Sequence, residues 1–161
     1  MLDDHPRAGD VTALLIEADG RNVRAARERI ARTQLDVAVI EGDAGNTSAL
    51  AGIVPVDVLL LCGMFGNISM ADIETTIDAS PSLLAPGATV IWTRRSVPVD
   101  LTPRIRQRFA DLGFTEIDFV NPDDDKFTVG TQRFAGDPTP FVVGHHLFDF
   151  IGYVTMIERG E

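Results

Sequence analysis

The chain has 161 residues, 45% of them hydrophobic and 24% charged, which predicts one domain with a proper hydrophobic core. Its 24 acidic and 14 basic residues give a net charge of −10, so the average surface repels nucleic-acid phosphates and anionic lipid headgroups. We therefore expect a small-molecule partner, and neither nucleic acid nor a membrane. Cys62 is the only cysteine, which excludes an internal disulfide. Together with an acidic N-terminus that lacks a signal-peptide pattern, this favours a cytoplasmic protein.

The first half of the chain predicts strands alternating with helices. Residues 11–17 form a continuous apolar run, typical of a strand covered on both faces in a parallel sheet. Residues 21–32 then change to helical spacing, with five arginines mostly opposite an apolar side. The most hydrophobic strand, 56–62, is expected in the middle of the sheet. Between these, the pattern predicts a strand and a short helix, at residues 37–40 and 48–53.

The second half continues the alternation. Ser69 is predicted to cap a helix from residue 70 to about 84, which Pro86 and Gly87 stop before the next strand. Gly113 is predicted to end an amphipathic helix. The remaining elements are expected as a strand at 88–93, that helix at 101–112, a strand at 114–120, a turn at 121–125 and a strand at 126–134.

This order predicts an α/β fold, a doubly wound Rossmann-like and mostly parallel sheet with a C-terminal antiparallel hairpin strand. We expect the domain to cover residues 1–136 and a Pro-rich tail to cover residues 137–161, packed on or over the domain. The aromatic residues of the tail either form a lid or dock the tail onto the core. His145 and His146 have no Cys or His at metal-ligand spacing, so no metal site is expected.

Acidic residues stand at the ends of two successive predicted strands. Glu17 ends the first strand with Asp19 close behind, and Asp43 follows the second strand. At the carboxyl edge of a nucleotide-binding sheet, such acids accept hydrogen bonds from ribose hydroxyls or from an exocyclic amine. The alternative is a solvated strand end or a turn aspartate. Two acids at successive strand tips favour the binding interpretation, because both would point into one crevice.

The segment CGMFGN, residues 62–67, follows the most hydrophobic strand. Its glycines allow the backbone to pass close to a ligand. No base stands near Cys62 in the sequence, so a packed or ligand-adjacent thiol is favoured over a catalytic one. Arg94 and Arg95 end the following strand and either reach a substrate or balance local acids.

With these pieces in order, the chain resembles class I S-adenosylmethionine-dependent methyltransferases from about Asp10 to Phe134. The resemblance rests on the order and spacing of LLIEADGRNVRAAR, EGDAGN, DVLLLCGMFGNIS, LLAPGATVIWTR, RIRQRFADLGFTEIDFV and KFTVGTQRF. It implies S-adenosylmethionine as cofactor and methyl transfer to a small-molecule acceptor, with no catalytic acid or base identified. By the same resemblance, the residues next to the cofactor are Glu17 at the ribose, Asp43 and Ala44 at the adenine, and Cys62, Gly63, Met64 and Phe65 at the methionine part. Asp19, close behind Glu17, is also expected to bind the cofactor.

One departure from the family is large: no counterpart of its first strand and glycine-rich loop precedes Asp10. We therefore expect a truncated first βα unit. In the family this strand lies between the two strands that residues 11–17 and 56–62 represent. Its absence would leave two strand edges unpaired. Either these strands close on each other, or another chain completes the sheet, for instance in a homodimer, or the domain is marginally stable.

Two other functions remain as alternatives. A signalling receiver domain is also doubly wound and begins with a strand ending in acids, but its phosphoacceptor aspartate is replaced here by Cys62. The second alternative is a non-catalytic binding or dimerisation module.

Overall fold

The structure is a computed structural model that describes residues 4–95, 99–121, 127–152, 154, 155 and 158. Within these residues strands and helices alternate, which confirms the predicted α/β fold. The strands are β1 (Thr12–Glu17), β2 (Asp36–Glu41), β3 (Val56–Leu61), β4 (Leu84–Arg95), β5 (Phe114–Val120) and β6 (Phe127–Phe134). The helices are α1 (Gly20–Ile30), α2 (Met70–Ala79) and α3 (Thr102–Asp111), with 3-10 turns η2 (Ala8–Asp10), η3 (Thr47–Leu50) and η4 (Ser80–Ser82). None of these described helices has the length and apolar character that crossing a membrane requires.

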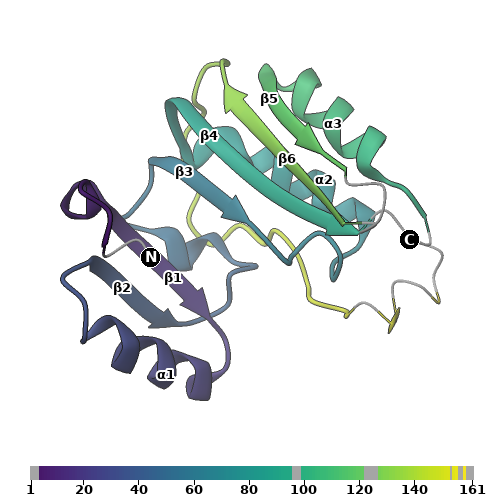
Figure 1. Cartoon of the computed structure of the whole chain (residues 1–161). Coiled ribbons are helices and arrows are strands. Elements are labelled where there is room, and N and C mark those ends of the chain that lie inside the picture. Colours follow the sequence, from purple (N-terminus) through teal and green to yellow (C-terminus); the bar gives the residue numbers. More distant parts are fainter. Residues whose placement is uncertain (1–3, 96–98, 122–126, 153, 156–157, 159–161) are drawn as a thin grey trace.

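The strands form two sheets (Figure 1). One consists of β1 and β2, which are parallel. The other has the order β3-β4-β6-β5, with β3 parallel to β4 and β6 antiparallel to both its neighbours. The predicted hairpin of the last two strands is confirmed. The predicted turn at 121–125 lies, apart from Asn121, outside the described residues.

Two predictions about strand burial are wrong. β3 is an edge strand of its sheet and not a central one, and its side chains Val58 and Leu60 are 54% and 61% exposed. β1 is not covered on both faces, since Leu15 is 47% exposed. The sequences of β1 and β3 are rich in aliphatic residues, as is typical of strands that are buried on both faces. In this structure, however, each of them is hydrogen-bonded along one edge alone.

The predicted cap of α2 is confirmed, but the predicted end of that helix is wrong. The Ser69 hydroxyl accepts a hydrogen bond from the backbone N–H of Asp72 at 3.1 Å. The α-helix ends at Ala79 because Pro81 has no N–H to donate to the carbonyl of Ile77. The Ser80 hydroxyl donates to that carbonyl instead, at 2.7 Å. Pro86 and Gly87 therefore lie inside β4 and do not stop the helix.

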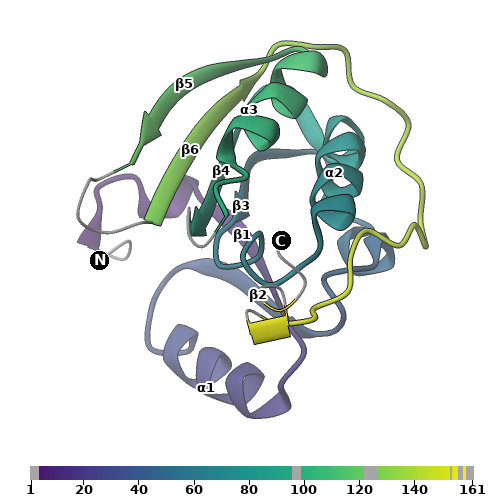
Figure 2. The same ribbon diagram turned by 90° about the vertical axis from the view of Figure 1, so that its right-hand side faces the viewer.

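Trp92 on β4 is the centre of the hydrophobic core. Its indole is fully buried, and the rings of Phe65, Phe109 and Phe119 lie 6.0 to 6.4 Å from it, centroid to centroid. α2 and α3 cover this face of the four-stranded sheet (Figure 2). Gly130 on β6 is paired with Trp92, and a Cβ at Gly130 would meet the indole at 2.2 Å. A glycine is therefore required here by packing.

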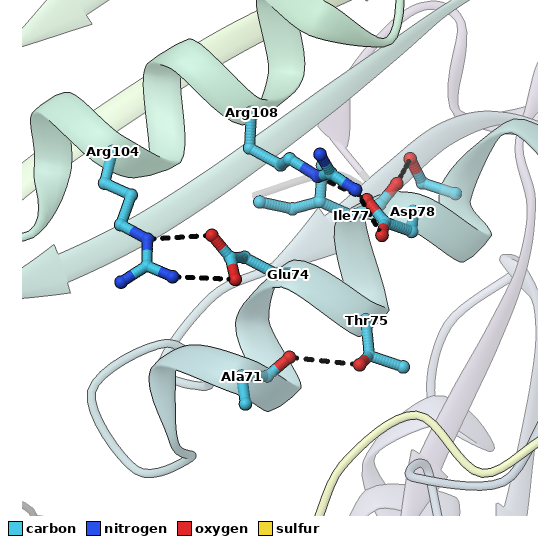
Figure 3. A network of polar contacts seen from close by, with 8 residues as sticks. Ala71, Glu74, Thr75, Ile77, Asp78, Arg104 and Arg108 are labelled. Carbon is cyan, nitrogen blue, oxygen red and sulfur yellow. Dashed lines mark hydrogen bonds and ion pairs between the residues drawn. The ribbon is translucent and has the colours of Figure 1, made fainter.

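Ion pairs hold α3 against α2 and β5. Arg104 donates two hydrogen bonds to Glu74 on α2, and Arg108 donates two to Asp78 (Figure 3). Arg106 donates to Glu116 on β5. The side chains of these pairs are 29% to 59% exposed, so solvent screens them and each pair contributes little to stability.

Replacing Gly130 by Ala should lower the free energy of unfolding by about 1–3 kcal/mol or more, since the new Cβ overlaps the indole of Trp92. Urea unfolding of the variant measures this change. Gly9→Ala is a matched control, because a Cβ at that position would have open space around it, with no contact within 4 Å. Equal midpoints for the two variants would contradict the packing argument.

Candidate functional site

The carboxyl ends of β1, β2, β3 and β4 all point the same way (Figure 1). The last residue of β1 and the loops after β1, β2 and β3 hold every residue that the sequence assigned to the cofactor. Ligands of open α/β sheets bind in the crevice outside such strand ends. The candidate site is therefore built from the loops at 17–20, 42–47 and 62–67.

Glu17 ends β1, and the start of α1 orients its carboxylate. Oε1 accepts a hydrogen bond from the backbone N–H of Asp19 at 2.8 Å. Oε2 accepts one from the Asn22 side-chain amide at 3.2 Å. Each carboxylate oxygen has a second lone pair, so Glu17 can still accept a hydroxyl proton at both oxygens. Glu17 is half-buried, and these two hydrogen bonds orient its carboxylate.

A second strand-end carboxylate lies beside it, which the sequence interpretation missed. Glu41 is the last residue of β2 and is paired in register with Glu17. Its carboxylate oxygens lie 3.2 Å from the position that a Cβ on Gly20 would take. The signal was present in the sequence, because Glu41 is the acid that ends the strand before Gly42, but Asp43 in the following turn was selected instead.

Asp19 acts within its own helix. Its carboxylate caps α1 by accepting from the backbone N–H of Arg21 at 2.8 Å, and it forms an ion pair with the Arg21 guanidinium at 2.6 Å. The Arg21 hydrogen bonds lower the pKa of the Asp19 carboxyl below its usual value. The structure thus gives Asp19 the turn and cap role that was its alternative interpretation, and a cofactor contact stays a prediction.

The loop after β2 is shaped by Asp43. Its Oδ1 accepts a hydrogen bond from the backbone N–H of Gly45 at 2.8 Å, which closes an Asx turn. Ala44, between them, is half-buried and packs against the hydrophobic core. Asp43 is exposed and directly precedes Ala44 in this turn.

The C-terminal tail joins this loop to the loop after β3. Leu147 donates its backbone N–H to the carbonyl of Gly45 at 2.7 Å, and Ile151 donates to the carbonyl of Asn67 at 2.9 Å. Leu147 and Phe148 are buried in the core. The tail therefore docks onto the core, one of the two roles expected of it. Since four residues span at most about 14 Å, the tail also holds the two loops close together.

The loop after β3 carries the remaining predicted residues. Cys62 is exposed, and Met64 is half-buried against the core. Phe65 is fully buried beside Trp92, so its side chain cannot reach a ligand in this conformation and its backbone alone is available. Gly63 is at φ +75°, a conformation that favours glycine, and its N–H donates to the Thr93 hydroxyl at 2.9 Å.

A cavity of about 120 Å³ opens between this loop and the end of β4. Its lining residues are Gly63, Gly66, Asn67, Thr93, Arg94, Arg95 and Phe127. Arg94 is buried and its guanidinium donates to the carbonyl of Phe65, so it supports the loop from below. Arg95 is exposed at the cavity. The described part of the chain holds no group of three His, Cys, Asp or Glu side chains arranged to bind a metal.

Replacing Gly45 by Ala should release the tail, because a Cβ at this position would lie 2.2 Å from the carbonyl oxygen of Phe148. We expect a loss of about 1–3 kcal/mol in unfolding free energy and faster amide exchange in residues 145–152. Gly42→Ala is the control, since its Cβ would make ordinary contacts at 3.9 Å or more. Unchanged amide exchange in the tail of the Gly45 variant would contradict the conclusion that Gly45 holds the tail in place.

We compared the sequence and the structure of the chain with those of known proteins. No family model matches the chain, and no curated protein matches it by sequence. Solved structures do match. N-methyltransferase NodS from Bradyrhizobium japonicum WM9 aligns with 76% of this chain and 73% of its own, at 16% identity and a TM-score of 0.57. Its complex with S-adenosyl-l-homocysteine aligns over 76% of this chain and 66% of its own, with a TM-score of 0.59.

Two further methyltransferases show the same likeness. Precorrin-6y C5,15-methyltransferase from Geobacter metallireducens GS-15 aligns over 78% of this chain and 68% of its own, at 14% identity and a TM-score of 0.57. An O-methyltransferase family protein from Burkholderia thailandensis aligns over 84% and 54%, at 14% identity and a TM-score of 0.58. The chain thus spans between about half and three quarters of the length of these solved chains. It has the fold of class I S-adenosylmethionine-dependent methyltransferases.

Proposed function

We propose that this chain binds S-adenosylmethionine at the strand tips of β1, β2 and β3 and transfers its methyl group to a small-molecule acceptor. One observation carries the proposal: within a methyltransferase fold, the Glu17 carboxylate is held in place by two hydrogen bonds at the sheet edge where ligands bind. The NodS complex contains S-adenosyl-l-homocysteine, the product form of this cofactor.

The residues at the strand tips fit the parts of that cofactor. Glu17 would accept the two ribose hydroxyl protons at its remaining lone pairs. Asp43 would accept from the adenine amine, next to the backbone of Ala44. The methionine part would lie along the backbone of residues 62–65, where Gly63 permits close approach. Asp19, as the cap that orients Glu17 through its N–H, supports the ribose site.

When bound, the cofactor would supply a sulfonium methyl group to an acceptor nucleophile that attacks the methyl carbon in line with the S–CH3 bond, and S-adenosylhomocysteine would leave with the electron pair of that bond. The protein contributes proximity and alignment of the two reactants. We infer that the acceptor presents its nucleophile in the cavity beside Gly63 and Thr93, with Arg95 at the rim. Asn67 supports this wall, because its side-chain amide donates to the carbonyl of Gly63 at 2.8 Å while its own carbonyl holds the tail.

The receiver interpretation has less support. A receiver sheet is entirely parallel, whereas β6 lies antiparallel between β4 and β5. The residue after β3 is Cys62, which cannot form the acyl phosphate that an aspartate forms. The non-catalytic interpretation differs from the proposal in one measurable property, cofactor binding.

Calorimetric titration with S-adenosylhomocysteine tests the proposal. The intact chain should bind it, and Glu17→Ala should weaken binding by roughly 10- to 100-fold, the effect of losing hydrogen bonds to a charged group. Glu28→Ala is the matched control, because it removes the same charge from an exposed position on α1 and should leave binding unchanged.

Absence of binding by the intact chain would refute the proposal and favour a non-catalytic module. Equal weakening in the Glu17 and Glu28 variants would show a general charge effect and not a ribose site. Thermal unfolding of both variants should be recorded as well, so that a fold defect in Glu17→Ala is recognised.

A further inference from the structure

The cavity at the end of β4 brings together three side chains from one face of the sheet. Thr93 and Arg95 are two residues apart on β4, so their side chains lie on the same face, and Arg95 is paired directly with Phe127 on β6. Figure 1 shows this end of β4 beside the loop that follows β3. All three residues line the cavity. A hydroxyl, a cation and an aromatic ring therefore meet at the place where the proposed acceptor would lie.

Thr93 and Arg95 can both donate hydrogen bonds to a ligand. The Thr93 hydroxyl accepts from the backbone N–H of Gly63 at 2.9 Å, and within the described part of the chain its own proton goes to no other group. An arginine has five N–H donors, so the contacts that Arg95 makes within the chain leave other donors for a ligand. A ligand with acceptor oxygens suits both side chains.

The charged residues among the described lining of the cavity are both arginines. Arg94 is buried and its guanidinium donates to the carbonyl of Phe65, while Arg95 is exposed. No described lining residue is acidic, although the whole chain has 24 acidic and 14 basic residues. A net charge of −10 repels anions from the average surface, so an anion that binds this chain requires a local cationic site. The cavity has the charge of such a site.

The size and the wall of the cavity suit a single ring. Its volume is about 120 Å³. A closed cavity of about 150 Å³ holds one benzene molecule. Phe127 is 38% exposed and provides an aromatic surface next to Arg95. Aromatic side chains pack favourably against other rings, so a ring with an anionic substituent matches both the wall and the donors.

We propose that the methyl acceptor is a small aromatic carboxylate. Its carboxylate would accept hydrogen bonds from the Arg95 guanidinium and the Thr93 hydroxyl, and its ring would pack against Phe127. The planar guanidinium matches the two oxygens of a carboxylate, and the single charge of this group matches one exposed arginine better than a doubly charged phosphate does. The inference rests on the proposed function, because it names the substrate class of the same site. It gives Arg95 the substrate role that the sequence left as one of two alternatives.

Fluorine NMR titration with 4-fluorobenzoate tests the proposal. The intact chain is titrated both with and without saturating S-adenosylhomocysteine, and 4-fluorobenzoate should bind saturably at one site. The matched neutral ligand is 4-fluorobenzamide, which has the same ring and a similar shape. It should bind about tenfold or more weakly, because hydrogen bonds to an ionised acceptor are much stronger than those to a neutral one.

Arg95→Gln should weaken 4-fluorobenzoate binding about tenfold or more, since it removes the charge and most of the donors. Arg95→Lys keeps the charge but not the planar pair of donors, so it should lose less affinity. Arg24→Gln is the matched control, because it removes the same charge from an exposed position on α1, and its affinity should be unchanged. Calorimetric titration of the same proteins with S-adenosylhomocysteine reports separately on the cofactor site.

Three results would overturn the proposal. If S-adenosylhomocysteine binds but 4-fluorobenzoate does not, the proposed function stands and the acceptor belongs to another chemical class. Equal affinities for the benzoate and the benzamide, or equal losses in the Arg95→Gln and Arg24→Gln variants, would show that Arg95 does not recognise a carboxylate. Absence of S-adenosylhomocysteine binding would refute the proposed function and, with it, the acceptor role of any carboxylate that binds.

Discussion

The backbone hydrogen bonds of the C-terminal tail hold the candidate site together. β2 and β3 belong to two different sheets, so no strand pairing fixes the loop after β2 relative to the loop after β3. Leu147 bonds to the first loop and Ile151 to the second, while the side chains of Leu147 and Phe148 are buried in the core. A short tail segment thus joins two loops that follow strands of different sheets. Gly45 lies so close to the tail backbone that a Cβ at this position would overlap the carbonyl oxygen of Phe148.

The local features of the fold were predictable because their signals lie within a few residues. Ser69 caps α2 three residues before the N–H it accepts, and Gly113 ends the helix before β5 at φ +80°. The acid at the end of β1 was predicted for the same reason. The end of α2 was mispredicted because two proline signals compete in that region, and the nearer one, at Pro81, determines where the α-helical bonds stop.

The long-range features could not be predicted from local patterns. Thr47 donates its hydroxyl to the carbonyl of Val142, 95 residues away, and nothing near either residue indicates the pairing. The apolar composition of β3 predicted a strand buried on both faces. Composition does not show which other strands lie beside it, so its position at the edge of a sheet could not be predicted. In the site, the strand-end position of Glu17 was visible, whereas the burial of the Phe65 side chain depends on Trp92, which is distant in sequence.

The exposed leucine and valine side chains on β1 and β3 also bear on how the protein behaves in solution. Unpaired aliphatic edges promote association between copies, and a net charge of −10 opposes it through repulsion. The balance is an electrostatic one, so it weakens as salt shortens the screening length and as acid protonates the surface carboxylates. The acidic residues therefore determine the colloidal stability of this chain. They oppose association between copies even where they do not stabilise the fold.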